Sequence, residues 1–246
     1  MKVKLISKTP NMFDVVYTGA RTCYNAGSPI DMFEDIENIS DDKKLKLIKN
    51  CIESGHHSVL EHAYFTFAIE GISRSCSHQL VRHRLASYSQ QSQRYVEIKE
   101  NHGELYDLLH GFATDEKIAK MKEIAEKYFV DVTDDNYYGY IHCLWQYTLR
   151  VSNGEKPEDA RNSLPNATKT NIVMSLNLRS CINFFSLRLC KSSQLEIRNL
   201  ASCMRDKILE IEPWLKPYLQ PKCILTNKCT EGKKCCGYLN NYKKQK

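Results

Sequence analysis

The sequence has no long hydrophobic run. None of its 246 residues belong to an apolar stretch near the roughly 18 residues that a membrane helix needs. The first ten residues hold no hydrophobic segment long enough for a secretion signal. We therefore expect a cytoplasmic protein without a membrane partner. With 42% hydrophobic and 26% charged residues, the composition is globular and excludes a disordered or fibrous chain.

Excess charge is also missing from most of the chain. The net charge is +6, and residues 222–246, with seven lysines and one glutamate, carry all of it. The neutral body gives no general attraction for nucleic acid, so we expect no such partner. The charge pattern predicts a domain over residues 1–221 and a Lys/Cys-rich tail over residues 222–246 that is a solvated extension. A basic-tailed nucleic-acid-binding protein is the alternative from another function class.

The closely spaced cysteine pairs of structural zinc sites are absent. Of 11 cysteines, seven are scattered through the body and are expected to be reduced and mostly buried. The other four are Cys223, Cys229, Cys235 and Cys236. Five residues separate the first two and five the next two, whereas zinc sites typically space their cysteines by two to four. We therefore predict no metal site.

The periodicity of apolar residues predicts one α+β domain. Helices are expected over residues 41–54, 72–81, 115–130, 134–151, 157–163, 177–190 and 193–211, and strands over residues 63–70, 95–98 and 170–175. Ala63, Phe65, Phe67 and Ile69 alternate along the first strand, which Gly71 is expected to end. Residues 87–93 are polar and predict a loop. Helices outnumber strands without regular alternation, which argues against a doubly wound sheet.

The densest polar cluster lies between residues 79 and 95. Residues 82–95 include three arginines, a histidine and three serines. Guanidinium forks, hydroxyls and free loop amides suit phosphate oxygens, so the cluster favours phosphate or nucleotide binding. A solvated helix end is the plainer alternative. Nucleic-acid binding would need more aromatic platforms than Tyr88 and Tyr95 supply.

Two further clusters stand out. His56, His57, Glu61 and His62 could bind a metal, although their spacing is not that of a His-Glu-x-x-His motif; hydrogen-bonded histidines are the alternative. The predicted helix over residues 177–190 carries two arginines and two asparagines among apolar residues. Half-buried polar groups need partners, which could be internal salt bridges or a ligand.

These motifs together resemble one family. Arg82-His83-Arg84, seven residues, Ser92 and then Arg94-Tyr95 resemble the signature of the flavin-dependent thymidylate synthases. Three further segments follow the family's order: Gly55-His56 with Ser58 and Glu61, Arg161-x-x-Leu164-Pro165, and Asn177-x-Arg179 with Asn183 and Arg188. The resemblance covers roughly residues 15–215.

The resemblance implies reductive methylation of dUMP to dTMP, a step of dTMP biosynthesis. In that family 5,10-methylenetetrahydrofolate supplies the one-carbon unit, reduced FAD supplies the hydride, and NADPH reduces the flavin. The implied fold is a single α/β domain with a small, mainly antiparallel sheet and flanking long helices, assembled as a homotetramer with active sites at subunit interfaces. A flavin held at an interface agrees with the absence of a G-x-G-x-x-G fingerprint.

The resemblance also implies site residues. The flavin would contact His56, Ser58, Arg82, His83, Arg84, Gln90, Asn177, Arg179 and Asn183. The dUMP would contact Gln79, Arg82, Gln90, Gln91, Ser92, Gln93, Arg94, Arg161 and Arg188. Arg188 is the expected catalytic residue, because a fixed guanidinium stabilises negative charge on the uracil ring without a cysteine adduct.

Three positions depart from the family pattern, one of them Cys23, which stands where the family often has Ser. Ser89 stands where the family usually has Asn, and Gln90 stands where it usually has Glu. Replacing a carboxylate by an amide removes a charge beside the expected ligands. A flavin- and nucleotide-binding homologue with altered or lost activity is therefore the second hypothesis.

Overall fold

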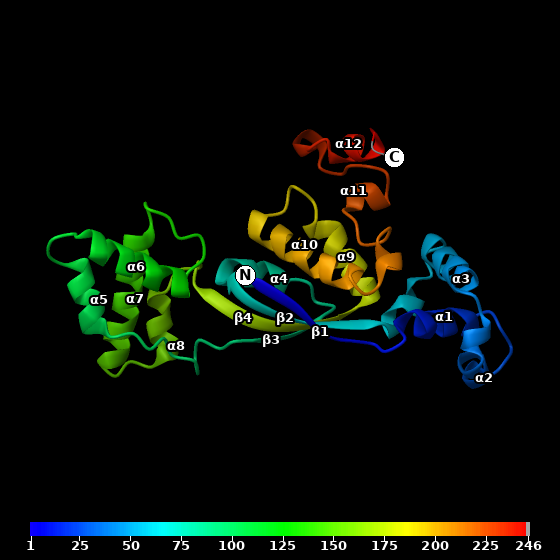
Figure 1. Cartoon of the computed structure of the whole chain (residues 1–246), viewed down its shortest axis with the longest axis horizontal. Coiled ribbons are helices and arrows are strands. Elements are labelled where there is room, and N and C mark those ends of the chain that lie inside the picture. Colours follow the sequence, from blue (N-terminus) through cyan, green and yellow to red (C-terminus); the bar gives the residue numbers. More distant parts are fainter. Residues whose placement is uncertain (245–246) are drawn as a thin grey trace. The chain divides into compact units, whose positions relative to one another are not determined.

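A computed structural model describes residues 1–244, and Figure 1 labels its helices and strands. The four strands are β1 (Lys2–Lys8), β2 (Tyr64–Ser73), β3 (Ser87–Gln90) and β4 (Lys169–Asn177), in the order β1-β2-β4-β3. The α-helices are α1 (Met12–Thr22), α2 (Pro29–Glu34), α3 (Asp41–Glu53), α4 (Arg74–Leu80), α5 (His102–Leu109), α6 (Asp115–Tyr128), α7 (Tyr137–Ser152), α8 (Pro157–Ala160), α9 (Leu178–Arg188), α10 (Leu195–Leu209), α11 (Lys222–Leu225) and α12 (Tyr238–Lys244). Short 3-10 turns are η1 (Ile36–Asn38), η2 (His57–His62), η3 (Arg161–Ser163), η4 (Pro213–Leu215) and η5 (Gly232–Lys234).

The contacts between β2 and β4 show that these strands are antiparallel. The hydroxyls of Thr66 and Ser175 are 2.9 Å apart, and further along β2 the Gly71 N–H donates to the Asn171 side chain at 3.1 Å. Partner numbers fall along β4 as they rise along β2, which is the antiparallel register. The predicted mixture of helices with a small antiparallel sheet is confirmed.

The chain separates into two compact units. Unit 1 comprises residues 1–2, 69–82 and 89–172, and unit 2 comprises residues 3–68, 83–88 and 173–244. The tail predicted to begin at residue 222 belongs to unit 2, and residue 221 is not a unit boundary.

Unit 1 has its core among α5, α6 and α7, which lie together in Figure 1. The buried cluster consists of Leu105, Leu109, Met121, Ala125, Phe129, Ile141 and Leu144. These residues recur at helical spacing on α6 and α7, so each helix turns one apolar face inward. Phe129 leaves the end of α6 and stacks on Tyr140 of α7 at 4.7 Å between ring centroids.

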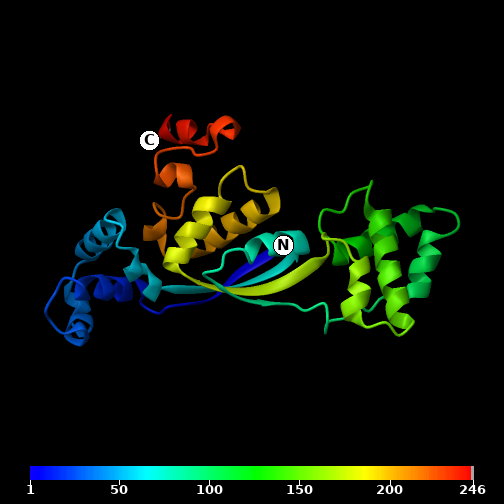
Figure 2. The ribbon, with the colours of Figure 1, turned by 180° about the vertical axis from the view of Figure 1, so that it is seen from behind.

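Unit 2 buries one face of each of its main helices. Helices α9 and α10 lie side by side when seen from either side (Figure 2), and α1 packs on α3 and on η2. Phe184 and Phe185 of α9 and Met204 of α10 are fully buried. Because α9 is fixed by this packing, its polar face holds defined positions.

Three strand predictions differ from the structure. Strand β2 continues through Gly71, whose φ of 69° allows the local turn while its N–H still finds a partner on β4. The expected loop over residues 87–93 begins with strand β3, a polar edge strand that polar composition concealed. The expected strand over residues 95–98 does not form; the Val96 N–H instead donates to the Ser92 carbonyl in a turn.

The predicted helices are confirmed within a few residues, although residue 72 belongs to β2 and α4 begins at Arg74. The structure corrects the prediction that the whole tail is a solvated extension. Helix α11 packs against α9, so this part of the tail is not a solvated extension. No helix within residues 1–244 is long and apolar enough to cross a membrane.

Candidate functional site

The structure divides the predicted site residues between the two units. Unit 1 contains Gln79, Arg82, Gln90, Gln91, Ser92, Gln93, Arg94 and Arg161. Unit 2 contains His56, Ser58, His83, Arg84, Asn177, Arg179, Asn183 and Arg188. Most residues expected to hold the nucleotide therefore belong to one unit, and most expected to hold the flavin belong to the other.

In unit 2 the predicted catalytic residue meets the histidine of the Arg-His-Arg motif. The Arg188 Nε donates to the His83 Nε2 at 3.1 Å. The His83 ring packs edge-on against the buried Phe184 at 4.8 Å between centroids. Phe184 and Arg188 lie four residues apart on α9 and so share a face. This face holds the imidazole between an aromatic ring and a guanidinium.

This environment keeps His83 neutral. Burial first, and then the positive charge of Arg188, lower the pKa of His83 from 6.5 to about 4. A neutral imidazole can accept the Arg188 hydrogen bond at Nε2, whereas an imidazolium cannot. The Tyr88 hydroxyl donates to the His83 carbonyl at 2.8 Å, and burial raises the pKa of Tyr88 to about 12, so it remains a donor. The Arg188 guanidinium is thus positioned by a neutral acceptor.

In unit 1 a cavity lies beside the motif's serine. It has a volume of about 490 Å³, and Gln91, Ser92 and Gln93 line it together with Lys127 and Lys169. Glu97 also lines the cavity, Lys127 pairs with Glu100, and Lys169 donates to the Glu126 carbonyl. The hydroxyl of Ser92 and the amides of Gln91 and Gln93 therefore suit a polar, hydrogen-bonding ligand.

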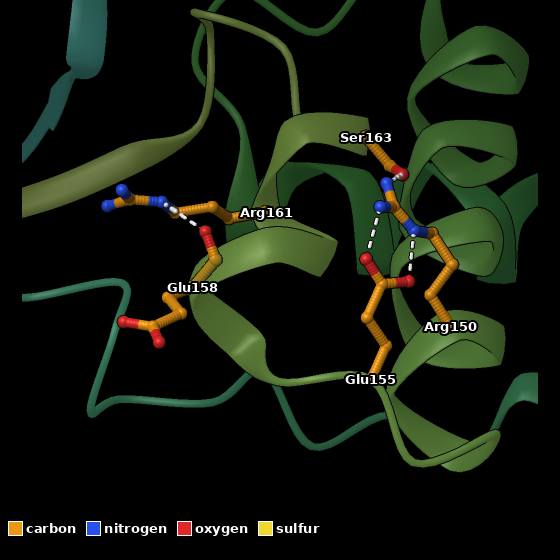
Figure 3. A network of polar contacts seen from close by, with 5 residues as sticks. All are labelled: Arg150, Glu155, Glu158, Arg161 and Ser163. Carbon is orange, nitrogen blue, oxygen red and sulfur yellow. Dashed lines mark hydrogen bonds and ion pairs between the residues drawn. The ribbon is translucent and has the colours of Figure 1, made fainter.

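A group of arginines lies in the same unit. Arg161 donates through Nε to the Glu158 carbonyl at 2.9 Å, and Figure 3 shows its terminal nitrogens directed away from that bond. Burial, and then the charge of Arg161, lower the pKa of Arg74. Within residues 1–244 neither Arg74 nor Arg161 forms an ion pair with an acidic side chain. The Glu158 carboxylate is an electrostatic neighbour of Arg161 but forms its ion pair with Arg94. Two neighbouring guanidiniums outside any such pair suit an anion such as phosphate.

Two nearby arginines already have carboxylate partners. Arg94 pairs with Glu158 at 2.6 Å. Arg150 forms a bidentate pair with Glu155 and also donates to Ser163 at 3.0 Å (Figure 3). Arg94 is among the residues predicted to contact dUMP, and doing so would exchange Glu158 for the ligand. Each of the three guanidinium nitrogens of Arg150 is hydrogen bonded within the protein, so Arg150 has a structural role.

The departure at Gln90 has a local explanation. Its Nε2 donates to the hydroxyls of Ser77 at 2.9 Å and Thr170 at 3.2 Å. Both hydroxyls are buried, so each benefits from a donor. A carboxylate at this position could accept from these hydroxyls but would bring a charge. The amide therefore links β3 to α4 and β4 through hydrogen bonds without adding a charge.

The other predicted flavin residues have individual surroundings. The Asn177 side chain caps α9 by accepting from the Ser180 N–H at 2.8 Å. Arg179 forms an ion pair with Glu61. His56 shares a hydrogen bond of 2.7 Å with the Tyr24 hydroxyl. Ser58, Arg84 and Asn183 are exposed in unit 2, as Arg82 is in unit 1.

Sequence reasoning missed Arg74 and Tyr24. Arg74 lies eight residues before the Arg-His-Arg motif and outside its spacing, so only the fold brings it to Arg161. Tyr24 precedes His56 by 32 residues. The three-histidine cluster does not form a metal site among the described residues: Glu61 pairs with Arg179, and the His57 ring is hydrogen bonded to the Ile52 carbonyl at 3.0 Å.

Comparison with known proteins decides the family. A family model described as "Thymidylate synthase complementing protein" matches residues 4–214. The chain belongs to the flavin-dependent thymidylate synthases. The flavin-dependent thymidylate synthase of Clostridium tetani is 38% identical, covering 99% of this chain and 96% of its own. That of Pyrococcus horikoshii is 40% identical, covering 94% and 90%.

A solved structure supports the same family assignment. Thymidylate synthase X from Helicobacter pylori, crystallised with FAD and dUMP, superposes with a TM-score of 0.68 at 26% identity, covering 89% of this chain and 99% of that one. The resemblance based on residues 55–61, 82–95, 161–165 and 177–188 is therefore confirmed at the level of the family. As a flavin-dependent thymidylate synthase, the chain carries the signature serine, Ser92, on the wall of a cavity.

Proposed function

We propose that this chain methylates dUMP to dTMP, with 5,10-methylenetetrahydrofolate as one-carbon donor, FAD as cofactor and NADPH as reductant. The observation that carries the proposal is the contact of Arg188 with a neutral His83, because it holds in a defined position the guanidinium that we propose to activate uracil. Family membership supports the same activity.

Arg188 would stabilise the negative charge that develops on the uracil ring. Its guanidinium cannot lose a proton at working pH, so its role is electrostatic and not that of a base. The bond from the Arg188 Nε to His83 fixes the orientation of the guanidinium, which would present its positive charge to the ring. Preorganisation of this kind lowers the cost of reorganising the donor during the reaction.

The substrate phosphate would bind in unit 1. Arg74 and Arg161 form no ion pair within the part of the chain that the structure describes, and they offer two guanidinium groups. Ser92 offers a hydroxyl on the cavity wall. Gln79, Gln91, Gln93 and Arg94 complete the proposed nucleotide set, with Gln90 acting on both ligands.

The donor set of the proposed flavin site fits a dinucleotide. Arg82 and Arg84 are exposed, and within residues 1–244 no acidic side chain lies within ion-pair distance of either. Such guanidiniums suit a diphosphate. His56, Ser58, Asn177, Arg179 and Asn183 would add hydrogen bonds. When bound and reduced, FAD supplies the hydride of the reaction.

We propose a homotetramer in which neighbouring chains complete each site. Support comes from apolar side chains that the motif leaves exposed: Leu85 is 74% and Tyr95 81% exposed. Large exposed apolar groups beside a site are typical of an interface. Light scattering should give the mass of four chains, and a monodisperse monomer that retains one FAD would refute the shared site.

The test of activity is turnover of dUMP with methylenetetrahydrofolate, NADPH and FAD, followed by release of tritium from dUMP labelled at carbon 5. Release together with dTMP supports the proposal. A yellow protein that binds dUMP but releases no tritium would be the homologue with altered activity. A colourless protein that binds DNA would support the nucleic-acid alternative.

A further inference from the structure

A second cavity, in unit 2, has a wall of positively charged and hydrogen-bonding side chains. Its volume is about 270 Å³, and residues from the end of α9, from α10 and from the tail line it. Besides three cysteines, its polar lining residues are Lys191, Arg198, Asn199, Ser202, Arg205 and Tyr238. Within residues 1–244 no acidic side chain lines it. None of these residues belongs to the sites proposed for dUMP or FAD.

The sequence of α10 explains why several of these side chains reach one cavity. Arg198, Ser202 and Arg205 follow one another at intervals of four and three residues, so they share a face of the helix. Ile197 and Met204 lie on another face, which is fully buried. Burial of the apolar face fixes the rotation of α10 about its axis. The direction of its cationic face is thereby fixed as well.

The cations on this wall outnumber their carboxylate partners. Arg205 donates through Nε at 3.1 Å and Nη2 at 3.0 Å to one oxygen of Asp206. Arg198 donates through Nη1 to the Lys191 carbonyl at 2.8 Å. In the part of the chain that the structure describes, neither the Arg198 nor the Lys191 side chain forms an ion pair. Three cations on the wall thus have one carboxylate partner.

The tail segment that lines the cavity adds to this positive charge. Cys223, Cys236 and Tyr238 are its lining residues, and residues 222–246 contain seven lysines and one glutamate. Like charges gathered in one place destabilise a compact state through self-repulsion. The fold nevertheless packs α11 of this segment against α9. An anion bound in the cavity would offset the repulsion.

We propose that this cavity binds a triphosphate group, either free or carried by a nucleotide. Phosphate oxygens accept hydrogen bonds from guanidinium, ammonium, amide and hydroxyl groups, which are the donors on its wall. Pockets for whole ligands are usually about 300–1,000 Å³, so this smaller cavity suits a phosphate chain. Leu189 and Cys190 line it and directly follow Arg188. The bound anion would therefore tie the end of α9 to α10 and to the tail.

Calorimetric titration of the full-length chain tests the proposal. The chain is first saturated with FAD and dUMP, so that the sites proposed for these ligands are occupied. Inorganic tripolyphosphate should then bind at one per chain. ATP is the second probe: tighter binding than that of tripolyphosphate identifies a nucleotide as the ligand, and equal or weaker binding shows that the phosphate chain alone is recognised. The heat of binding does not depend on turnover, so this proposal and the proposed function can fail separately.

Variants locate the site. Arg198→Gln should weaken tripolyphosphate binding by about 10- to 100-fold, the effect of losing one charged hydrogen bond. Lys191→Gln should also weaken it, and Lys191 is exposed, so this change should not disturb folding. Lys207→Gln is the matched control, because it removes one positive charge from α10 at a residue that pairs with Glu210 and does not line the cavity. The control should bind as wild type does.

Three results would overturn the proposal. A wild-type chain that shows no saturable binding of tripolyphosphate does so without any variant. Equal weakening by Lys207→Gln and Arg198→Gln would show that net charge alone attracts the anion. Unchanged binding by a chain that carries both Lys191→Gln and Arg198→Gln, and that circular dichroism shows to be folded, would place the anion elsewhere.

Discussion

The stability of this protein should depend on pH through His83. Burial and Arg188 lower the pKa of folded His83 from 6.5 to about 4. The unfolded chain therefore takes up its proton first as the pH falls. The stability that neutral His83 contributes is fully present above about pH 6.5 and is lost as the pH falls towards 4. One pKa unit is worth 1.36 kcal/mol, so the loss over this window is about 3 kcal/mol.

The variant that isolates this effect is His83→Gln. Glutamine can accept the Arg188 hydrogen bond through its amide oxygen but does not titrate. We would measure urea unfolding at a series of pH values between 7 and 4 for both proteins. The carboxylates contribute equally to the pH dependence of both proteins. The difference between the two curves of unfolding free energy against pH therefore measures the contribution of His83. The variant should lose about 3 kcal/mol less than wild type over the window.

The rate of turnover should also depend on pH through the contact between His83 and Arg188. Protonated His83 cannot accept from Arg188 and repels it, so the guanidinium loses its position. Turnover by wild type should fall as the pH approaches 4, while His83→Gln should show a flatter profile at low pH. Parallel loss of stability in the two proteins between pH 7 and 4 would refute a neutral, buried His83.

Three further outcomes are expected. Arg188→Ala should keep FAD but lose turnover by about 100-fold or more, and Arg188→Lys should recover little; near-wild-type rates would exclude uracil activation by this residue. Arg74→Ala should raise the KM for dUMP by about 10- to 100-fold, the effect of one charged hydrogen bond, whereas Arg150→Gln should leave it unchanged. In chemical denaturation, Phe184→Ala should cost about 3–5 kcal/mol and the exposed Leu187→Ala no more than about 0.5; equal costs would contradict the packing of α9.

The helices and the main strands could be predicted because their signals are local. Apolar residues recur at helical spacing on α6, α7 and α10, and they alternate along β2. Strand β3 has no such signal. Its four residues are polar, and backbone pairing beside β4 together with the Gln90 contacts holds it. Edge strands of this kind depend on a neighbour that sequence patterns do not reveal.

The spaced signature of arginine, histidine and serine identified the family and the residues expected at its site. That was possible because the chemistry of phosphate and uracil recognition demands particular side chains at fixed intervals. Tertiary structure decided which of them meet. The bond between Arg188 and His83 joins residues 105 apart in the chain.

The same limit applies to Arg74 with Arg161. The identity and spacing of these side chains are visible along the chain. Whether two guanidiniums become neighbours depends on how helices and turns far apart in sequence pack. Packing is a property of the whole buried core, and only the folded chain determines it.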